Sequence, residues 1–259
     1  MDELLKIGLN LPLFGLVLCR IGGLVLAAPI LSSMTIPLRV RAAFTAVLGL
    51  IMFPIASRGP VALPEGILGY LPIALQEMGL GLLMGFSAAM LIAALEAAGG
   101  LAAQQIGVAL AQVASPDTHR QEHVISIFLG IVGLLLFLAA DGHHWLIQAL
   151  ASSYRQVPLG MAVWRNEFSA LLLQGLSGFT LAALRIAAPL MGIMFMLTVL
   201  IALIARTVPQ MNILLVGYPV KVFVGVMSLV LTFPLMWPVL RGAFQNLQAQ
   251  LTYLAAGGG

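Results

Sequence analysis

Apolar residues form long stretches along this chain, and polar residues gather in the short intervals between them. Six stretches are long enough to be helices, at about 9–30, 38–57, 68–95, 124–147, 178–205 and 211–240. A helix of about 20 residues crosses the hydrocarbon core of a bilayer, because each residue adds about 1.5 Å. The charge-free runs 186–205 and 222–240 reach that length. The pattern therefore predicts an all-α membrane protein with about six long hydrophobic helices.

Three segments depart from this simple pattern. Glu77 divides the third stretch, which predicts either a kinked span or a span followed by an interfacial turn. Residues 97–115 are rich in Ala, Gly and Gln, and we expect a separate, non-spanning segment packed against protein. After Leu240, apolar residues recur at spacings of three and four: Phe244, Leu247, Leu251 and Leu254. This stripe predicts a short amphipathic helix that lies on the membrane interface or docks on a partner.

Composition supports the membrane interpretation and excludes several classes of protein. Of 259 residues, 61% are hydrophobic and 8% are charged, whereas a soluble domain has about 25% charged residues. A water-soluble enzyme and a disordered chain are both excluded, since disorder requires low hydrophobicity and high charge. The net charge of +3 comes from singly scattered basic residues, so no nucleic-acid partner is expected. The acidic start 1–3 does not resemble a signal peptide, and we expect the first stretch to be retained.

Motifs for catalysis or cofactor binding are not convincing. Residues 175–178 read Gly-Leu-Ser-Gly, a form seen around the nucleophile of rhomboid-type intramembrane proteases. Those proteases place the catalytic histidine on a later span, but all four histidines here precede Ser177. Close helix packing is the better interpretation of these small residues. The chain also lacks a phosphate-binding Gly-Lys-Ser/Thr loop, a His-Glu-x-x-His motif and a dinucleotide fingerprint. We expect no enzyme activity and no cofactor.

The four histidines are also candidate metal ligands. His119 and His123 are four residues apart and would share one helix face, but no further ligand completes a convincing set. His143 and His144 follow Asp141 at the end of a predicted span, where structural capping is expected. The sequence therefore predicts no metal site.

Charged residues inside the apolar stretches require a physical explanation. They are Arg20, Glu77, Arg185 and Lys221. Placing one at the bilayer centre costs about 2.5–3.5 kcal/mol on insertion scales. These charges therefore predict pairing, a water-filled cavity or contact with another subunit, and a structural ion pair and an ion-translocation role both stay open. The Gly81-x-x-x-Gly85 pattern predicts a close contact between two helices.

Several segments go beyond composition and carry a family resemblance. They are 28–29, 36–41, 105–116, 141–147, 153–160, 206–212 and 216–221. In order and spacing they closely resemble the FliR family of flagellar biosynthetic proteins, across nearly the whole chain. The run from Arg206-Thr-Val-Pro-Gln-Met-Asn212 to Gly217-Tyr-Pro219 is the most specific part. The related export protein of virulence type III secretion is similar, but the stretches 142–144 and 153–158 look more flagellar.

The resemblance implies a subunit of the flagellar export gate in the bacterial inner membrane, at the basal body. Family members assemble with FliP and FliQ, beside FlhB and FlhA, around a narrow channel for unfolded export substrates. The resemblance also implies helical hairpins, with a FliP-like part over 1–175. A FliQ-like hairpin and the short amphipathic helix would occupy 176–259. A secondary transporter with a midplane site is the strongest alternative function, but the sequence shows no internal repeat.

The resemblance further implies two groups of functional residues. Family members place a loop in the channel, and its matching positions are Gly107, Leu110, Val113 and Pro116. Apolar side chains at a constriction exclude water and ions. Leu110 and Val113 stand where bulky aromatics are common, and Ser115 replaces the usual aspartate, so a looser seal and a merely packed loop both stay open. The bend of the last hairpin is expected to contact neighbouring subunits through Arg206, Pro209, Asn212, Gly217, Pro219 and Lys221.

Overall fold

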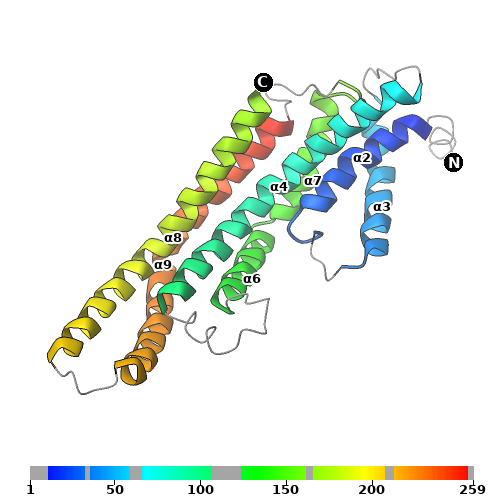
Figure 1. The fold of residues 1–259 in the computed structure, drawn as a ribbon. Coiled ribbons are helices and arrows are strands. Elements are labelled where there is room, and N and C mark those ends of the chain that lie inside the picture. Colours follow the sequence, from blue (N-terminus) through cyan, green and yellow to red (C-terminus); the bar gives the residue numbers. More distant parts are fainter. Residues whose placement is uncertain are drawn as a thin grey trace. The chain divides into compact units, whose positions relative to one another are not determined.

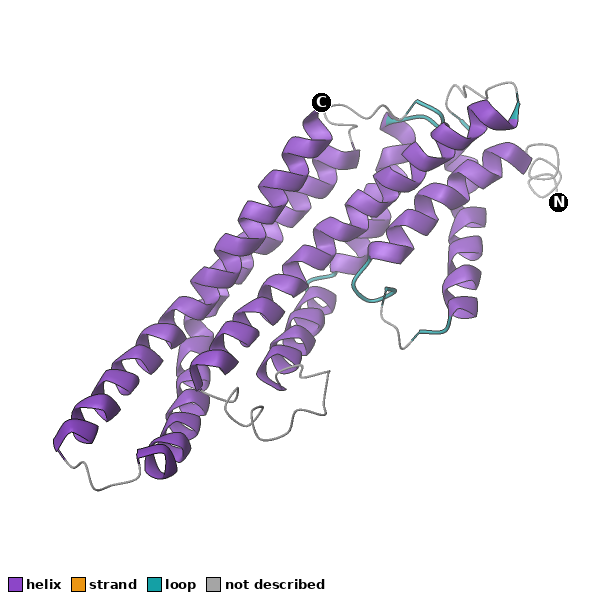
Figure 2. Cartoon of the chain, in the orientation of Figure 1, coloured by secondary structure: helices purple, strands orange, loops and turns teal. Residues whose placement is uncertain are grey.

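The computed structural model of the protein describes residues 11–32, 36–58, 66–106, 124–161, 166–207 and 213–255. Within these ranges the chain is entirely helical apart from turns and short loops (Figures 1 and 2). The helices are α2 (Leu11–Ala27), α3 (Leu38–Ala56), α4 (Ile67–Ile106), α6 (Val124–Ala139), α7 (Gly142–Gln156), α8 (Asn166–Thr207) and α9 (Ile213–Ala255). The predicted all-α class is confirmed, but the described residues form seven helices where about six were expected.

Two of the predicted helix boundaries are wrong, because continuous helices replace the expected breaks. Helix α4 has 40 residues and passes through Glu77. It continues to Ile106, so the first part of the segment expected at 97–115 belongs to the same helix. Helix α9 has 43 residues and includes the C-terminal stripe, which is therefore not a separate short helix. The stripe residues Phe244, Leu247, Leu251 and Leu254 are buried within the chain itself, whereas a position on the membrane interface or against a partner was expected.

The fourth apolar stretch is broken where a single helix was expected. Helices α6 and α7 form a pair bent by 61°. At the break Asp141 adopts a left-handed backbone conformation with φ of 58°, which few residues other than glycine favour. The ring of Phe137 lies directly against Gly142, so the space of a side chain at this position is already occupied. The polar sequence Asp-Gly-His-His thus ends one helix and starts another.

Several helices have the length and apolar character of membrane spans. Four of the described helices are long and apolar enough to cross a membrane: α3 and most of α4, α8 and α9. The bent pair α6–α7 gives a fifth span if the two helices are counted as one. The most apolar window of α4 is 56% buried within the protein, but those of α3, α8 and α9 are only 22% buried. A surface of this kind requires lipid or protein around it. The helices therefore support the prediction of a membrane protein.

The described helices belong to two compact units. Unit 1 comprises Met1–Met90, Leu136–Leu176 and Gln245–Gly259, and in it α3 packs on α2 and contacts α7. Unit 2 comprises Leu91–Leu135 and Ser177–Phe244. Its core consists of Ala102, Ile106, Leu190 and Met194. Gly225 lies against the Ile106 side chain in this unit. The predicted division into 1–175 and 176–259 stays a prediction.

Candidate functional site

An ion pair lies in the interior of unit 1. Arg20 of α2 and Glu77 of α4 are both 0% exposed, and Arg20 Nε donates to Glu77 Oε2 over 2.6 Å. Two charges removed from water lose their hydration, so their mutual attraction stabilises the fold only when their remaining donors and acceptors are also satisfied. The surroundings of this pair supply those partners.

The segment at the end of α7 provides hydrogen-bond partners for both charges. Arg20 Nη1 donates to Ser153 Oγ at 3.1 Å, and Arg20 Nη2 donates to the Val157 carbonyl oxygen at 3.2 Å. The Gly160 amide donates to Glu77 Oε1 at 2.9 Å. Both carboxylate oxygens and all three guanidinium nitrogens therefore have partners. The pair joins α2 and α4 to a later segment of the chain, in which Gly160 follows Glu77 by 83 residues.

The aromatic ring of Tyr154 also contacts the Arg20 guanidinium. The Tyr154 ring centroid lies 4.6 Å from Arg20 Cζ, which is a favourable cation–π distance. The Tyr154 hydroxyl donates to the Val17 carbonyl oxygen at 3.2 Å, and the residue is 1% exposed. Ser153 and Tyr154 are consecutive on α7, so one turn of this helix contacts the guanidinium through two side chains. We call Arg20, Glu77, Ser153, Tyr154 and the Val157–Gly160 backbone the buried polar cluster.

Glycines allow α2 and α4 to approach closely enough for this cluster to form. A Cβ on Gly81 would collide with the Arg20 carbonyl oxygen, and one on Gly23 would collide with that of Met78. A Cβ on Gly85 would lie 2.6 Å from the Leu24 carbonyl oxygen. The predicted close contact at Gly81-x-x-x-Gly85 is therefore confirmed. Gly23, on the facing helix, belongs to the same contact but was not recognised in the sequence.

Among the charges inside apolar stretches, the structure distinguishes two situations. Arg20 and Glu77 form the structural ion pair that was one of the two open interpretations. Arg185 is exposed and Lys221 is half-buried, and neither joins an ion pair within the described part of the chain. The pairing partners Ser153, Val157 and Gly160 were not identified beforehand, although all three lie in the 153–160 stretch that carries the family resemblance.

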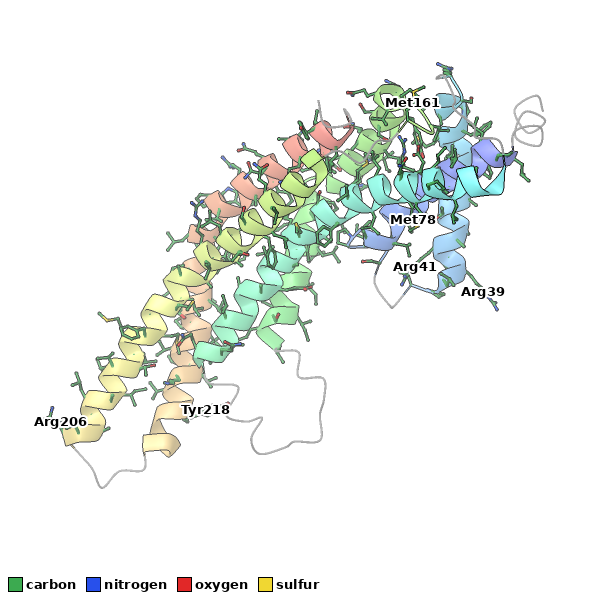
Figure 3. All side chains as sticks on the ribbon, turned by 45° about the horizontal axis from the view of Figure 1, so that its top comes forward. Arg39, Arg41, Met78, Met161, Arg206 and Tyr218 are labelled. Atoms are coloured by element: carbon green, nitrogen blue, oxygen red, sulfur yellow. The ribbon has the colours of Figure 1, made fainter. Side chains whose placement is uncertain are left out.

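The predicted channel and hairpin residues are only partly described. Gly107, Leu110, Val113 and Pro116 lie outside the described residues, as do Pro209 and Asn212. Arg206 is exposed in the last turn of α8. Gly217, Pro219 and Lys221 lie near the start of α9, around Tyr218 (Figure 3). Arg206 therefore belongs to α8, and Gly217, Pro219 and Lys221 belong to α9, where a bend between helices was expected. The subunit contacts assigned to these residues stay predictions.

The described helices define a class: a multi-helical membrane-type protein with a charged pair and its partners buried in unit 1. Residues 11–247 match the family described as bacterial export proteins, family 1. The chain belongs to this family, whose similar curated members include flagellar biosynthetic proteins FliR. It is 32% identical to FliR of Escherichia coli K12 over 235 residues, which cover 89% of this chain and 87% of that protein.

A distant relative gives the same result. The chain is 28% identical to the flagellar biosynthetic protein FliR of Bacillus subtilis strain 168 over 237 residues, 90% of each chain. The chain therefore belongs to a family of flagellar biosynthesis and protein export, and it has the apolar helices of a membrane protein. The family is not a known class of enzyme.

Proposed function

We propose that the chain is a non-enzymatic channel subunit of the flagellar type III protein export gate. It sits in the bacterial inner membrane at the basal body and assembles with FliP and FliQ, beside FlhB and FlhA. Together they form a narrow conduit for unfolded flagellar proteins. The observation that carries this proposal is the match to a bacterial export family over residues 11–247.

The surface of unit 2 supports an assembled state. Large apolar side chains on α8 and α9 are widely exposed, including Met196 at 70%, Phe223 at 67% and Val230 at 66%. Exposed apolar areas larger than a few hundred Å² are rare on soluble monomers. Neighbouring gate subunits and lipid would cover these side chains.

The buried polar cluster argues against the transporter alternative. Secondary transporters typically form a midplane site from broken helices, and an acidic side chain that bound a solute there would face a cavity with its oxygen atoms. Glu77 was the acid deep in a predicted span, but its oxygens are bonded to Arg20 and to the Gly160 amide. The Glu77 carboxylate therefore binds groups of the protein itself and joins its helices, and it does not bind a solute.

Two parts of the proposal concern residues named from the family resemblance. The loop with Gly107, Leu110, Val113 and Pro116 would form an apolar constriction that yields to a passing chain and otherwise excludes water. The bend between α8 and α9 would contact neighbouring subunits.

Deletion of the gene tests the proposed function. A strain without this chain should build no flagellar filaments and should retain filament protein inside the cell, and a plasmid copy should restore both. A deletion strain that assembles full-length filaments would overturn the proposal. Secretion of an unrelated protein through the general secretory pathway, measured in the same strain, serves as the control for membrane integrity.

The hairpin bend has its own test. Arg206→Ala and Asn212→Ala should each reduce copurification with FliP and FliQ several-fold, because both side chains would bond to backbone groups of the neighbours. Arg58→Ala provides a control, since Arg58 is also an exposed arginine but lies after α3, outside α8 and α9. Unchanged copurification and motility in the Arg206 and Asn212 variants would remove the contact role.

A further inference from the structure

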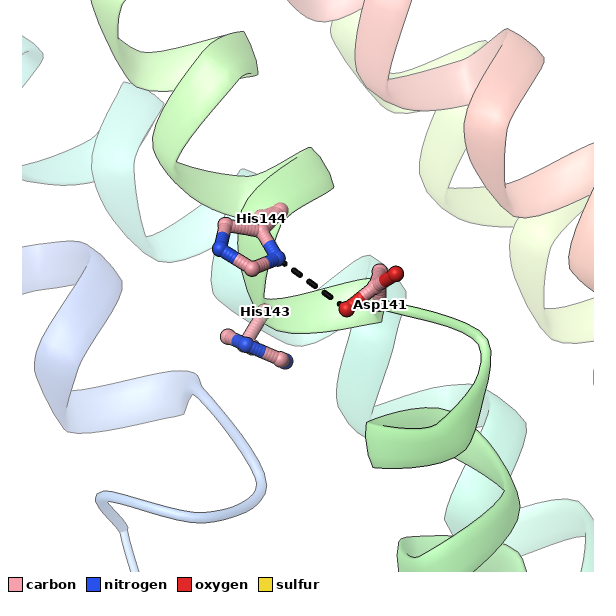
Figure 4. Close-up of side chains that lie close together, drawn as sticks. All are labelled: Asp141, His143 and His144. Atoms are coloured by element: carbon pink, nitrogen blue, oxygen red, sulfur yellow. Dashed lines mark hydrogen bonds and ion pairs between the residues drawn. The ribbon is translucent and has the colours of Figure 1, made fainter.

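Three metal-ligating side chains meet at the break between α6 and α7. We propose that Asp141, His143 and His144 bind a divalent transition metal ion of the zinc class. One ligand atom from each residue lies within 4.8 Å of the other two. Figure 4 shows both imidazoles and the carboxylate on the same turn. This site is separate from the buried polar cluster and does not depend on the proposed export function.

The Asp141 carboxylate is exposed and does not cap the helix. Asp141 is the residue before α7, where an aspartate side chain ordinarily accepts backbone N–H groups of the first turn. Here no side-chain cap bond forms, and the amides of His144 and Trp145 donate to the Asp141 backbone carbonyl at 2.9 and 3.2 Å. The carboxylate Oδ1 instead lies 3.1 Å from His144 Nδ1. The capping role expected from sequence is therefore not performed by this side chain.

His143 contributes a second, independent observation. Its Nδ1 is buried and has no hydrogen-bond partner within the described residues. Buried ring nitrogens are normally satisfied by protein or water, so this atom requires a partner. The two imidazole ring centroids are 4.2 Å apart, so the rings of His143 and His144 lie next to each other at this turn. A metal ion would bind one nitrogen of His143 together with the exposed Asp141 carboxylate and the exposed His144 imidazole.

The ligand set suits a zinc ion. Two imidazoles and one carboxylate are a known set for Zn²⁺, whose fourth position then holds water. With bonds of about 2.0–2.1 Å, tetrahedral ligand atoms lie about 3.4 Å apart. The widest separation must shorten by at most about 1.4 Å, which rotation of the exposed Asp141 and His144 side chains allows. The positive end of the α7 dipole opposes a cation, so we expect moderate affinity.

A bound ion would fix the bend between the two helices. Asp141 precedes α7, and its left-handed conformation sets the direction in which the chain leaves α6. Cross-linking its carboxylate to His143 and His144 would hold that conformation. The proposed role of the metal is to make the bend rigid.

Zinc binding by the purified full-length chain tests the proposal. His119→Gln and His123→Gln are present in every sample, because these histidines could bind zinc by themselves, and a tag without histidine is used. In this background we expect one zinc per chain in competition with a chromophoric indicator. Asp141→Asn and His144→Gln should each weaken binding at least about tenfold. Asn tolerates the left-handed conformation and His144 is exposed, so both variants should keep the fold.

Gln156→Ala, at the exposed end of α7, is the matched control and should bind zinc like the background chain. X-ray absorption of the bound zinc should show two imidazole ligands. Zinc that fails to bind, that binds equally to all variants, or that shows no imidazole ligand would overturn the proposal.

Discussion

Arg20→Met should destabilise the protein by about 3–5 kcal/mol, because it leaves the Glu77 carboxylate buried without its charged partner. The variant should lose the hydrogen bonds to Ser153 and Val157 as well. We expect a sharply lower amount of folded chain in membranes and a lower thermal aggregation midpoint in detergent. Motility should fall with the amount of chain.

A double variant distinguishes the effect of the unpaired charge from the effect of the lost side-chain volume. Arg20→Met combined with Glu77→Leu removes both charges and keeps apolar volume, so it should be more stable than Arg20→Met alone. Arg39→Met changes an exposed arginine of unit 1 and should have almost no effect. If Arg20→Met is as stable as Arg39→Met, the buried polar cluster does not hold unit 1 together.

Gly23→Ala should have the second largest effect, with a loss of about 1–3 kcal/mol. The added methyl group would collide with the Met78 carbonyl oxygen, and the backbone cannot move aside without separating α2 from α4. The ion pair lies at the same helix contact, so a wider spacing also lengthens the Arg20–Glu77 bond. The readouts are again the aggregation midpoint and the amount of chain in membranes.

The neighbouring glycine provides the control. A Cβ on Gly22 would have no atom within 4 Å, and the residue lies in the same helix. Gly22→Ala should therefore stabilise the helix by about 0.5–1 kcal/mol, because alanine loses less entropy on folding. Equal effects of the two substitutions would contradict the close contact at Gly23.

Hydrophobic periodicity was sufficient for the helical class, but it placed several helix ends wrongly. A window of apolar residues cannot tell whether Glu77 breaks a helix or lies inside one, because the answer depends on Arg20, which is 57 residues away. The break at Asp141 is likewise a backbone event, because the polar Asp-Gly-His-His sequence does not by itself show whether a helix continues through it or ends there. The apolar C-terminal stripe was recognised from its spacing, whereas its continuity with α9 was not.

The buried polar cluster could be predicted only in part. Charges in an apolar stretch must be paired, so Arg20 and Glu77 were recognisable as unusual. Nothing in the local sequence shows that the Val157 carbonyl and the Gly160 amide would complete the pair, because every residue has a backbone carbonyl and nearly every one an amide. Ser153 and Tyr154 stand in a family-like stretch, which does not show that they contact Arg20. Long-range hydrogen bonds of this kind become visible when the fold is known.

The order of the cluster along the chain has a consequence for biosynthesis. Arg20 and Glu77 leave the ribosome well before Ser153, Val157 and Gly160, which supply the remaining hydrogen bonds. Until translation has passed Gly160, the nascent protein carries two charges in an apolar environment that lacks part of its solvation. Membrane quality-control proteases should therefore degrade chains truncated before that point faster than chains that end after it.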